Sequence, residues 1–250
     1  MIITIYKRVL SVLAKKPFHL WGISLLVGFL GGVATMLFGL IIGIPFMINL
    51  LLTTGMALIY LRGYRGEEIK SVQLFDAFKD GKTLKRVLGG MAWMELWIFL
   101  WALIPIVGIV FAIIRAYQYR LTPYILMTEP DIAATEAIKV SKERTMGWKG
   151  KMFGADILIY VIIFVASLLL GLLSIIPFIG ILFRIVSILF SLAVFLFMPL
   201  FMGLVRAAFY EEIMNPTAPE KIEGSARFCP NCGSPVGPES VYCPNCGKQI

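Results

Sequence analysis

The stretch VIIFVASLLLGLLSIIPFIGILFRIVSILFSLAVFLF, residues 161–197, decides the fold of this chain. It contains two long apolar runs joined by the turn SIIPFIGIL (174–182), and this turn carries no charged residue. A helix needs about 20 predominantly apolar residues to cross the hydrocarbon core of a bilayer. The stretch therefore predicts a transmembrane hairpin of two helices.

The rest of the chain has the composition of a membrane protein. Hydrophobic residues make up 59% of its 250 residues and charged residues only 15%, whereas soluble domains carry roughly 25% charged residues. We predict all-α transmembrane spans at 20–40, 45–61, 88–104, 107–127, 153–175 and 179–206. The expected fold is therefore a polytopic protein with six transmembrane helices, arranged as three helical hairpins.

The distribution of basic residues predicts the orientation in the membrane. A net charge of +8 would suggest nucleic acid in a soluble protein. Here, however, all lysines and arginines except Arg115, Arg120 and Arg184 lie near the N-terminus, in two long connections (62–86 and 139–151), or from Arg206 onward. Cytoplasmic segments of membrane proteins are enriched in lysine and arginine. We expect a multi-pass protein of the cell (inner) membrane with both termini in the cytoplasm.

Residues 1–19 form the first predicted segment, an amphipathic helix. At about 100° per residue, Thr4, Lys7, Arg8, Ser11 and Lys15 fall on one narrow stripe and apolar residues on the opposite side. The helix could lie in the membrane interface, with its basic residues toward anionic head groups. The alternative is that it packs on its own protein, and the sequence favours neither.

The segment 20–213, which holds the six predicted spans, shows signs of internal repetition. The phrases IPIVGIVF (104–111) and IPFIGILF (176–183) match, and the preceding cytoplasmic segments DAFKDGK (76–82) and EAIKVSK (136–142) share a register. Together with a fainter N-terminal copy, they predict three repeats of a cytoplasmic amphipathic helix followed by a transmembrane hairpin. The alternative is that proline and glycine recur because tight turns need them.

Two stretches carry a resemblance to a known family: LFDAFKDGKTLKRVLGG (74–90) and LTPYILMTEPDIAATEAIKVSKERTMGWKGKMF (121–153). They are similar to a bacterial integral-membrane family catalogued as domain of unknown function 975, over roughly residues 20–213. The most specific positions are Tyr117, Tyr119, Thr122, Pro123, Tyr124, Ala137, Ser141, Met146 and Gly147. The resemblance implies a polytopic membrane fold and adds no activity. The chain departs from many members of that family by its cysteine-containing tail.

The tail contains all four cysteines of the protein. After a flexible linker (214–226), the segment 227–250 reads Cys229-x2-Cys232-x10-Cys243-x2-Cys246, and each pair lies in the sequence Cys-Pro-Asn-Cys-Gly. Four thiolates in two such pairs suit tetrahedral Zn²⁺ and leave no open coordination position, which predicts a zinc ribbon with one structural ion. Disulfides fit a cytoplasmic location poorly, and the short spacer argues against a rubredoxin-like iron site.

Charged residues inside the predicted spans form a second candidate site. Glu95 lies in the third span, and Arg115 and Arg120 lie in the fourth, at similar depths around the Pro105 turn. Unpaired charges in a membrane are costly, so we expect these residues to pair. The pair is either a structural link between helices or part of a polar cavity for ligand or ion passage. Pro123 is expected to break the fourth span nearby.

These features predict a non-catalytic membrane scaffold or regulatory adaptor, whose cytoplasmic ribbon docks a protein partner. The alternative is a transporter or permease-like component that uses the Glu95, Arg115 and Arg120 cluster. We find no catalytic constellation and expect no enzyme activity. The segment 221–250 has a net charge of only about +1, which disfavours nucleic acid as a partner. Phe228 and Tyr242 either contact a partner or pack the ribbon, and glycines four apart in the first span leave a homo-oligomer open.

Overall fold

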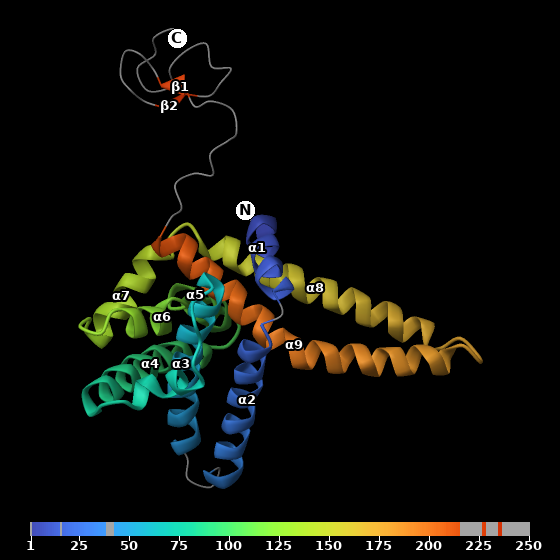
Figure 1. Cartoon of the computed structure of the whole chain (residues 1–250), viewed down its shortest axis with the longest axis horizontal. Helices are drawn as coiled ribbons and strands as arrows, with labels where there is room; N and C mark the ends of the chain where they lie inside the picture. The colour runs from blue at the N-terminus through green and yellow to red at the C-terminus, as the bar shows by residue number, and fades with distance from the viewer. Residues whose placement is uncertain (1, 16, 39–42, 216–226, 229–234, 237–250) are drawn as a thin grey trace. The chain divides into compact units, whose positions relative to one another are not determined.

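The computed structural model describes residues 2–15, 17–38, 43–215, 227–228 and 235–236. The chain divides into two compact units, Met1–Ile213 and Met214–Ile250. The described part of the first unit is helical (Figure 1). Its elements are α1 (Ile2–Ala14), α2 (Phe18–Phe38), α3 (Ile44–Arg65), the 3-10 helix η1 (Ser71–Phe78), α4 (Gly81–Ala102), α5 (Val107–Gln118), α6 (Thr122–Thr128), α7 (Ala134–Arg144), α8 (Lys149–Leu173) and α9 (Gly180–Met214).

Helix α3 is the centre of the helical unit. It packs against α2, η1, α4 and α6, and its residues Ile59 and Leu61 are completely buried. Gly55 permits the closest approach, because a methyl group at this position would overlap the backbone carbonyl of Leu74 in η1. The core continues into α6 and the last four turns of α9, where Leu204 and Phe209 are fully buried.

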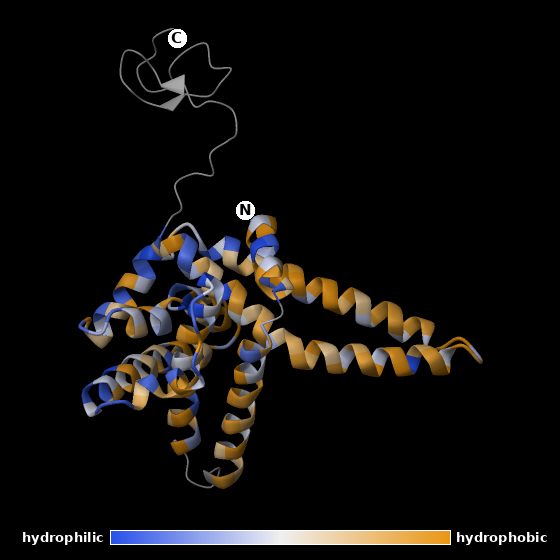
Figure 2. Cartoon of the chain, in the orientation of Figure 1, coloured by the Kyte–Doolittle hydropathy of each residue, from blue (hydrophilic) through white to orange (hydrophobic). Residues whose placement is uncertain are grey.

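Within the described residues, four helices are long and apolar enough to cross a membrane: α2, α3, α8 and α9. The two long apolar helices α8 and α9 are coloured as hydrophobic over almost their whole length in Figure 2. The most apolar stretch of α8 has no buried residue, as expected for a helix that contacts lipid. These helices indicate a multi-pass membrane protein, in agreement with the coarse prediction from the sequence.

The third and fourth predicted spans are not among these four helices. Helix α4 contains the third span, but it carries Lys82, Lys85 and Arg86 near its start and Glu95 further along. The fourth span is divided. Helix α5 has 12 residues, about 18 Å at 1.5 Å per residue, and α6 follows after a break. Pro123 lies in the first turn of α6, as expected from its missing N–H group.

The two matching phrases fold into the same turn. In each, the N–H of the second residue after proline donates to the proline carbonyl: Val107 to Pro105 over 2.7 Å, and Ile179 to Pro177 over 2.8 Å. The residue between them has a positive φ, 60° at Ile106 and 67° at Phe178. This γ-turn conformation is rare for residues with side chains, so its occurrence twice reflects the shared sequence.

Helix α1 packs on the helical unit, which is one of the two alternatives that its sequence left open. Ile5 and Val9 are buried, and the Tyr6 hydroxyl donates a hydrogen bond to the Ala155 carbonyl of α8. Arg8 forms an ion pair with Glu212 of α9 at 3.0 Å. Lys7 stays exposed on the polar stripe, as an interfacial location would also require.

The second unit contains two short strands, β1 (Arg227–Phe228) and β2 (Pro235–Val236). They pair in an antiparallel manner, with Arg227 opposite Val236 and Phe228 opposite Pro235. The four cysteines, Tyr242 and the predicted linker from residue 216 onward lie outside the described residues.

Candidate membrane cavity and zinc ribbon

A cavity of about 1100 Å³ lies within the helical unit, lined by residues of α2, α3, α4, α5, α6, α8 and α9 and of the segment between α5 and α6. Most of its lining side chains are aliphatic, methionine or aromatic. Its charged residues are Glu95, Arg120, Asp156 and Arg206, and its tyrosines are Tyr60, Tyr117, Tyr119, Tyr124 and Tyr160. The cavity therefore combines an apolar wall with a few polar groups, which is the usual composition of a ligand site.

Arg120 forms the best-defined polar contact of the cavity, and its partner is Asp156 of α8. Nη1 of Arg120 lies 2.8 Å from Oδ2 of Asp156, and Nη2 donates to Oδ1 over 3.0 Å. Tyr117 also donates its hydroxyl hydrogen to Asp156, over 2.8 Å. The side chains of Arg120 and Asp156 are only 10% and 12% exposed. This nearly buried pair ties the end of α5 to α8.

The predicted pairing of Glu95 with Arg115 or Arg120 is not what the structure shows. Arg115 donates to the amide oxygen of Gln118 over 2.8 Å and stacks over the Trp101 ring at 5.8 Å, away from the cavity lining. Glu95 lines the cavity, and within the described part of the chain it has no ion pair or hydrogen bond. The structure thus brings Glu95 and Arg120 to one cavity but gives Arg120 a different carboxylate.

Asp156 could have been found from the sequence. It is the only charged residue between Lys151 and Arg184, and an isolated charge in an apolar run is expected to have a partner. Arg206 was also missed, because it was counted with the cytoplasmic residues. Helical spacing in the sequence could have placed Arg206 on the same face of α9 as the apolar residues that line the cavity. Phe195, Met198, Pro199, Met202, Gly203 and Arg206 follow one stripe of α9 and all line the cavity.

The break between α5 and α6, which positions Arg120, is stabilised by side chains of α7. The Ser141 hydroxyl donates to the Gln118 carbonyl over 2.8 Å and accepts from the Leu121 N–H over 3.2 Å. The Thr145 hydroxyl lies 3.2 Å from the same Gln118 carbonyl, although its shorter hydrogen bond, of 2.8 Å, goes to the Ser141 carbonyl within α7. These bonds satisfy backbone groups that the interrupted helix leaves without partners.

The other end of α6 is held by α4. The Nη2 atom of Arg86 donates to the Leu126 carbonyl over 2.8 Å, and its Nη1 atom donates to the Glu129 carbonyl over 3.2 Å. Helix ends expose carbonyl groups that a guanidinium can satisfy.

At the start of α4, Asp80 accepts hydrogen bonds from the N–H and hydroxyl of Thr83, and these bonds lower the pKa of Asp80 below its ordinary value.

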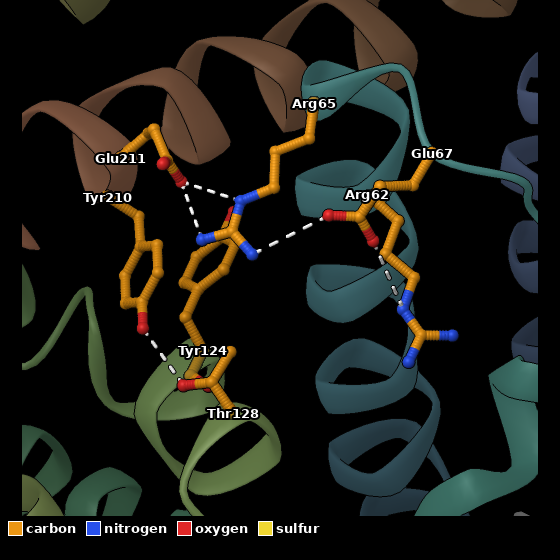
Figure 3. A network of polar contacts seen from close by, with 7 residues as sticks. All are labelled: Arg62, Arg65, Glu67, Tyr124, Thr128, Tyr210 and Glu211. Atoms are coloured by element: carbon orange, nitrogen blue, oxygen red, sulfur yellow. Dashed lines mark hydrogen bonds and ion pairs between the residues drawn. The ribbon is translucent and has the colours of Figure 1, made fainter. Parts of the chain in front are cut away.

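A polar network at the end of α9 lies between α3, α6 and α9 (Figure 3). Arg65 forms an ion pair with Glu211 at 2.8 Å and a longer one with Glu67 at 3.7 Å. The Thr128 and Tyr210 hydroxyls share a hydrogen bond of 2.9 Å. With the pair between Arg8 and Glu212, these contacts fix the last turns of α9, immediately before the chain continues toward the ribbon.

Residues 221–250 match the zinc-ribbon domain family, and this match implies that the tail binds zinc. The chain shows no match to the family of unknown function 975. No curated protein and no solved structure matches the chain.

The residues of the tail fit the metal that its family implies. Cys229, Cys232, Cys243 and Cys246 supply four soft thiolate donors in two pairs, which is the donor set of a closed tetrahedral zinc site. Among the described residues, no cluster of three or more His, Cys, Asp or Glu side chains could hold a metal ion.

Proposed function

We propose that the protein is a non-catalytic membrane scaffold or regulatory adaptor, whose ribbon docks a cytoplasmic protein. The observation that carries this proposal is the match of residues 221–250 to the zinc-ribbon family in a unit separate from the helical unit. We propose that the four cysteines bind one Zn²⁺ ion with a structural role. A domain this short has little core, so metal binding supplies most of its folding free energy.

A crosslinked affinity capture from native membranes tests the adaptor proposal. The intact protein is compared with a Cys232→Ser/Cys246→Ser variant, and the zinc content of both is measured. We expect a cytoplasmic protein to be recovered only with the zinc-loaded form. Glu95→Gln is the matched control and should leave this recovery unchanged. Identical partners for both forms, with the helical unit folded in each and zinc lost from the variant, would refute docking by the ribbon.

A second candidate function is that of a transporter or permease-like component, and the cavity is the observation that favours it. Glu95 and the Arg120–Asp156 pair line this cavity, and polar groups inside a membrane domain often mark a substrate path. The same variants separate the two functions. A cellular defect caused by Glu95→Gln but not by the cysteine substitutions would assign the function to the cavity.

We also propose six transmembrane spans, with α4 forming the third and α5 and α6 together forming the fourth (107–127), and three internal repeats. The common turn of residues 104–111 and 176–183 supports this, because it makes α4–α5 and α8–α9 equivalent hairpins. Each hairpin also follows a short helical element: α1 precedes α2–α3, η1 precedes α4–α5, and α7 precedes α8–α9. Under the repeat proposal, α1, η1 and α7 are equivalent. Under this proposal both termini lie in the cytoplasm of the cell (inner) membrane.

Membership of the family of unknown function 975 is likewise a proposal for residues 20–213. It is supported by the positions that carry the resemblance, several of which have a physical role. Pro123 begins α6 and Ser141 caps the helix break. Gly147 has a φ of 79°, which favours glycine over residues with side chains.

A further inference from the structure

We propose that the cavity binds one membrane phospholipid, with its phosphate at Arg206 and an acyl chain along the apolar face of α9. This inference names a ligand class for the cavity of the second candidate function and rests on that site. It does not require transport, and it is independent of the ribbon.

The size of the cavity argues for a long amphiphile. Its volume of about 1100 Å³ exceeds the range of roughly 300–1,000 Å³ that is typical of small-molecule sites. An ion or a small metabolite would leave most of the apolar wall without a partner. A lipid chain fills such a volume with the same kind of surface that the bilayer provides.

The cavity has a charged end and an apolar end along a single helix stripe. Arg206 lies 11 residues after Phe195 on α9, which corresponds to roughly 16 Å along the axis. Met198, Met202 and Gly203 line the stripe between them. One leaflet of the hydrocarbon core measures roughly 15 Å. The stripe therefore has the length of an acyl chain, and its cation lies toward the end of α9 that the charge distribution assigns to the cytoplasm.

Two arginines line the cavity, Arg120 and Arg206, and Arg206 is the one that is free to bind a ligand. Its side chain is exposed although Val205 and Ala207 on either side are buried. Within the described residues it forms no ion pair or hydrogen bond, whereas Arg120 is neutralised by Asp156. A guanidinium binds phosphate oxygens through two parallel hydrogen bonds. Glu95 also lines the cavity, on the α4 wall, and its carboxylate would accept hydrogen bonds from a hydroxyl or amine of the head group.

Exposed lining residues on α8 and α9 mark the side from which a lipid would enter the cavity. Both helices contribute lining residues, but beyond their common turn they make few close backbone contacts with each other. Tyr160 of α8 is 56% exposed and Phe195 of α9 is 73% exposed, although both line the cavity. A lipid could therefore enter sideways, without passing through the protein.

Native mass spectrometry of the full chain in a nonionic detergent tests this proposal. The probes are phosphatidylethanolamine, phosphatidylglycerol, a diacylglycerol with the same chains, and inorganic phosphate. We expect one phospholipid to be retained in preference to diacylglycerol, and Arg206→Gln to weaken its binding by roughly tenfold to a hundredfold. Arg184→Gln, an exposed arginine of α9 outside the lining, should have no effect.

A steric pair of variants keeps the test independent of charge. Ala116→Phe fills part of the cavity and should reduce retention, whereas Ala193→Phe, exposed on α9 and outside the lining, should not. The proposal is overturned if Arg206→Gln retains phospholipid as well as the intact protein does. Equal retention of diacylglycerol, or displacement of the lipid by inorganic phosphate, also overturns it. Because binding is measured directly, a protein that retains phospholipid but transports nothing would refute only the second candidate function.

Discussion

At the scale of single residues, the Arg120–Asp156 pair is the contact that joins the α5–α6 break to α8. It joins segments 36 residues apart, and Tyr117 adds a second donor to the same carboxylate and a ring beneath the guanidinium at 5.0 Å. A buried ion pair gives little net stability relative to apolar side chains of similar volume. Removing one partner alone is costly, because the other charge remains buried.

Asp156→Asn should therefore destabilise the helical unit by about 3–5 kcal/mol. The double variant Arg120→Met/Asp156→Leu should recover most of that loss, because it leaves no buried charge. Thermal unfolding in detergent, followed by tryptophan fluorescence, measures both effects. Glu95→Gln is the control, a carboxylate of the same cavity without an ion pair in the described residues, and should change stability far less. Equal losses for Asp156→Asn and Glu95→Gln would contradict the role of the pair.

Ser141 supports a second prediction at this scale. Leu121 is almost completely buried, and its N–H donates to the Ser141 hydroxyl. In Ser141→Ala this N–H loses its partner, which should cost about 1–3 kcal/mol. Ser11→Ala removes a serine hydroxyl that bonds within its own helix, to the Arg8 carbonyl, at an exposed position of α1, and should stay within about 0.5 kcal/mol. The same unfolding measurement compares the two, and a loss at Ser141 no larger than at Ser11 would show that the break needs no cap.

At the scale of elements, the turn between α8 and α9 requires a glycine. A methyl group at Gly180 would overlap the Ser174 carbonyl, and one at Gly108 would overlap the Trp101 carbonyl in the equivalent turn. Gly180→Ala and Gly108→Ala should each cost about 1–3 kcal/mol, as overpacking does. Gly171→Ala, inside α8 with no atom near the added methyl, should be neutral or stabilising because alanine favours a helix. If thermal unfolding shows that all three substitutions change the stability in the same direction, the shared turn is contradicted.

The elements also show what the sequence could and could not predict. Local patterns gave the hairpin turns, the break near Pro123 and the cysteine spacing of the ribbon, because neighbouring residues determine each of them. The partner of Arg120 could not be predicted in this way, since Asp156 lies on another helix and only packing brings the two together. Arg206 was assigned to the cytoplasm by its position in the chain, whereas the stripe it shares with Phe195 and Met202 directs it toward the cavity.

At the scale of the whole molecule, the open question is whether α4 and α5 cross the membrane. If they do, the protein has six spans, and if they do not, it has four. Length and hydropathy select α2, α3, α8 and α9, and both four and six spans leave the termini on one side. The turn between α4 and α5 favours six. Leu103 and Ile106 are 60% and 82% exposed, and exposing such apolar side chains to water rather than lipid costs about 25 cal/mol per Å².

Cysteine labelling in intact cells with a membrane-impermeant maleimide distinguishes these topologies. If α4 and α5 cross the membrane, Leu103→Cys should be labelled from outside, because this turn then lies on the same face as the turn between α8 and α9. Ile175→Cys, in that second turn, is the positive control, and Met146→Cys, in a basic connection, should be labelled only after the cells are opened. The ribbon cysteines should add no label to intact cells. Labelling of Leu103→Cys only in opened cells would limit the protein to four spans and place the α4–α5 hairpin on the cytoplasmic side.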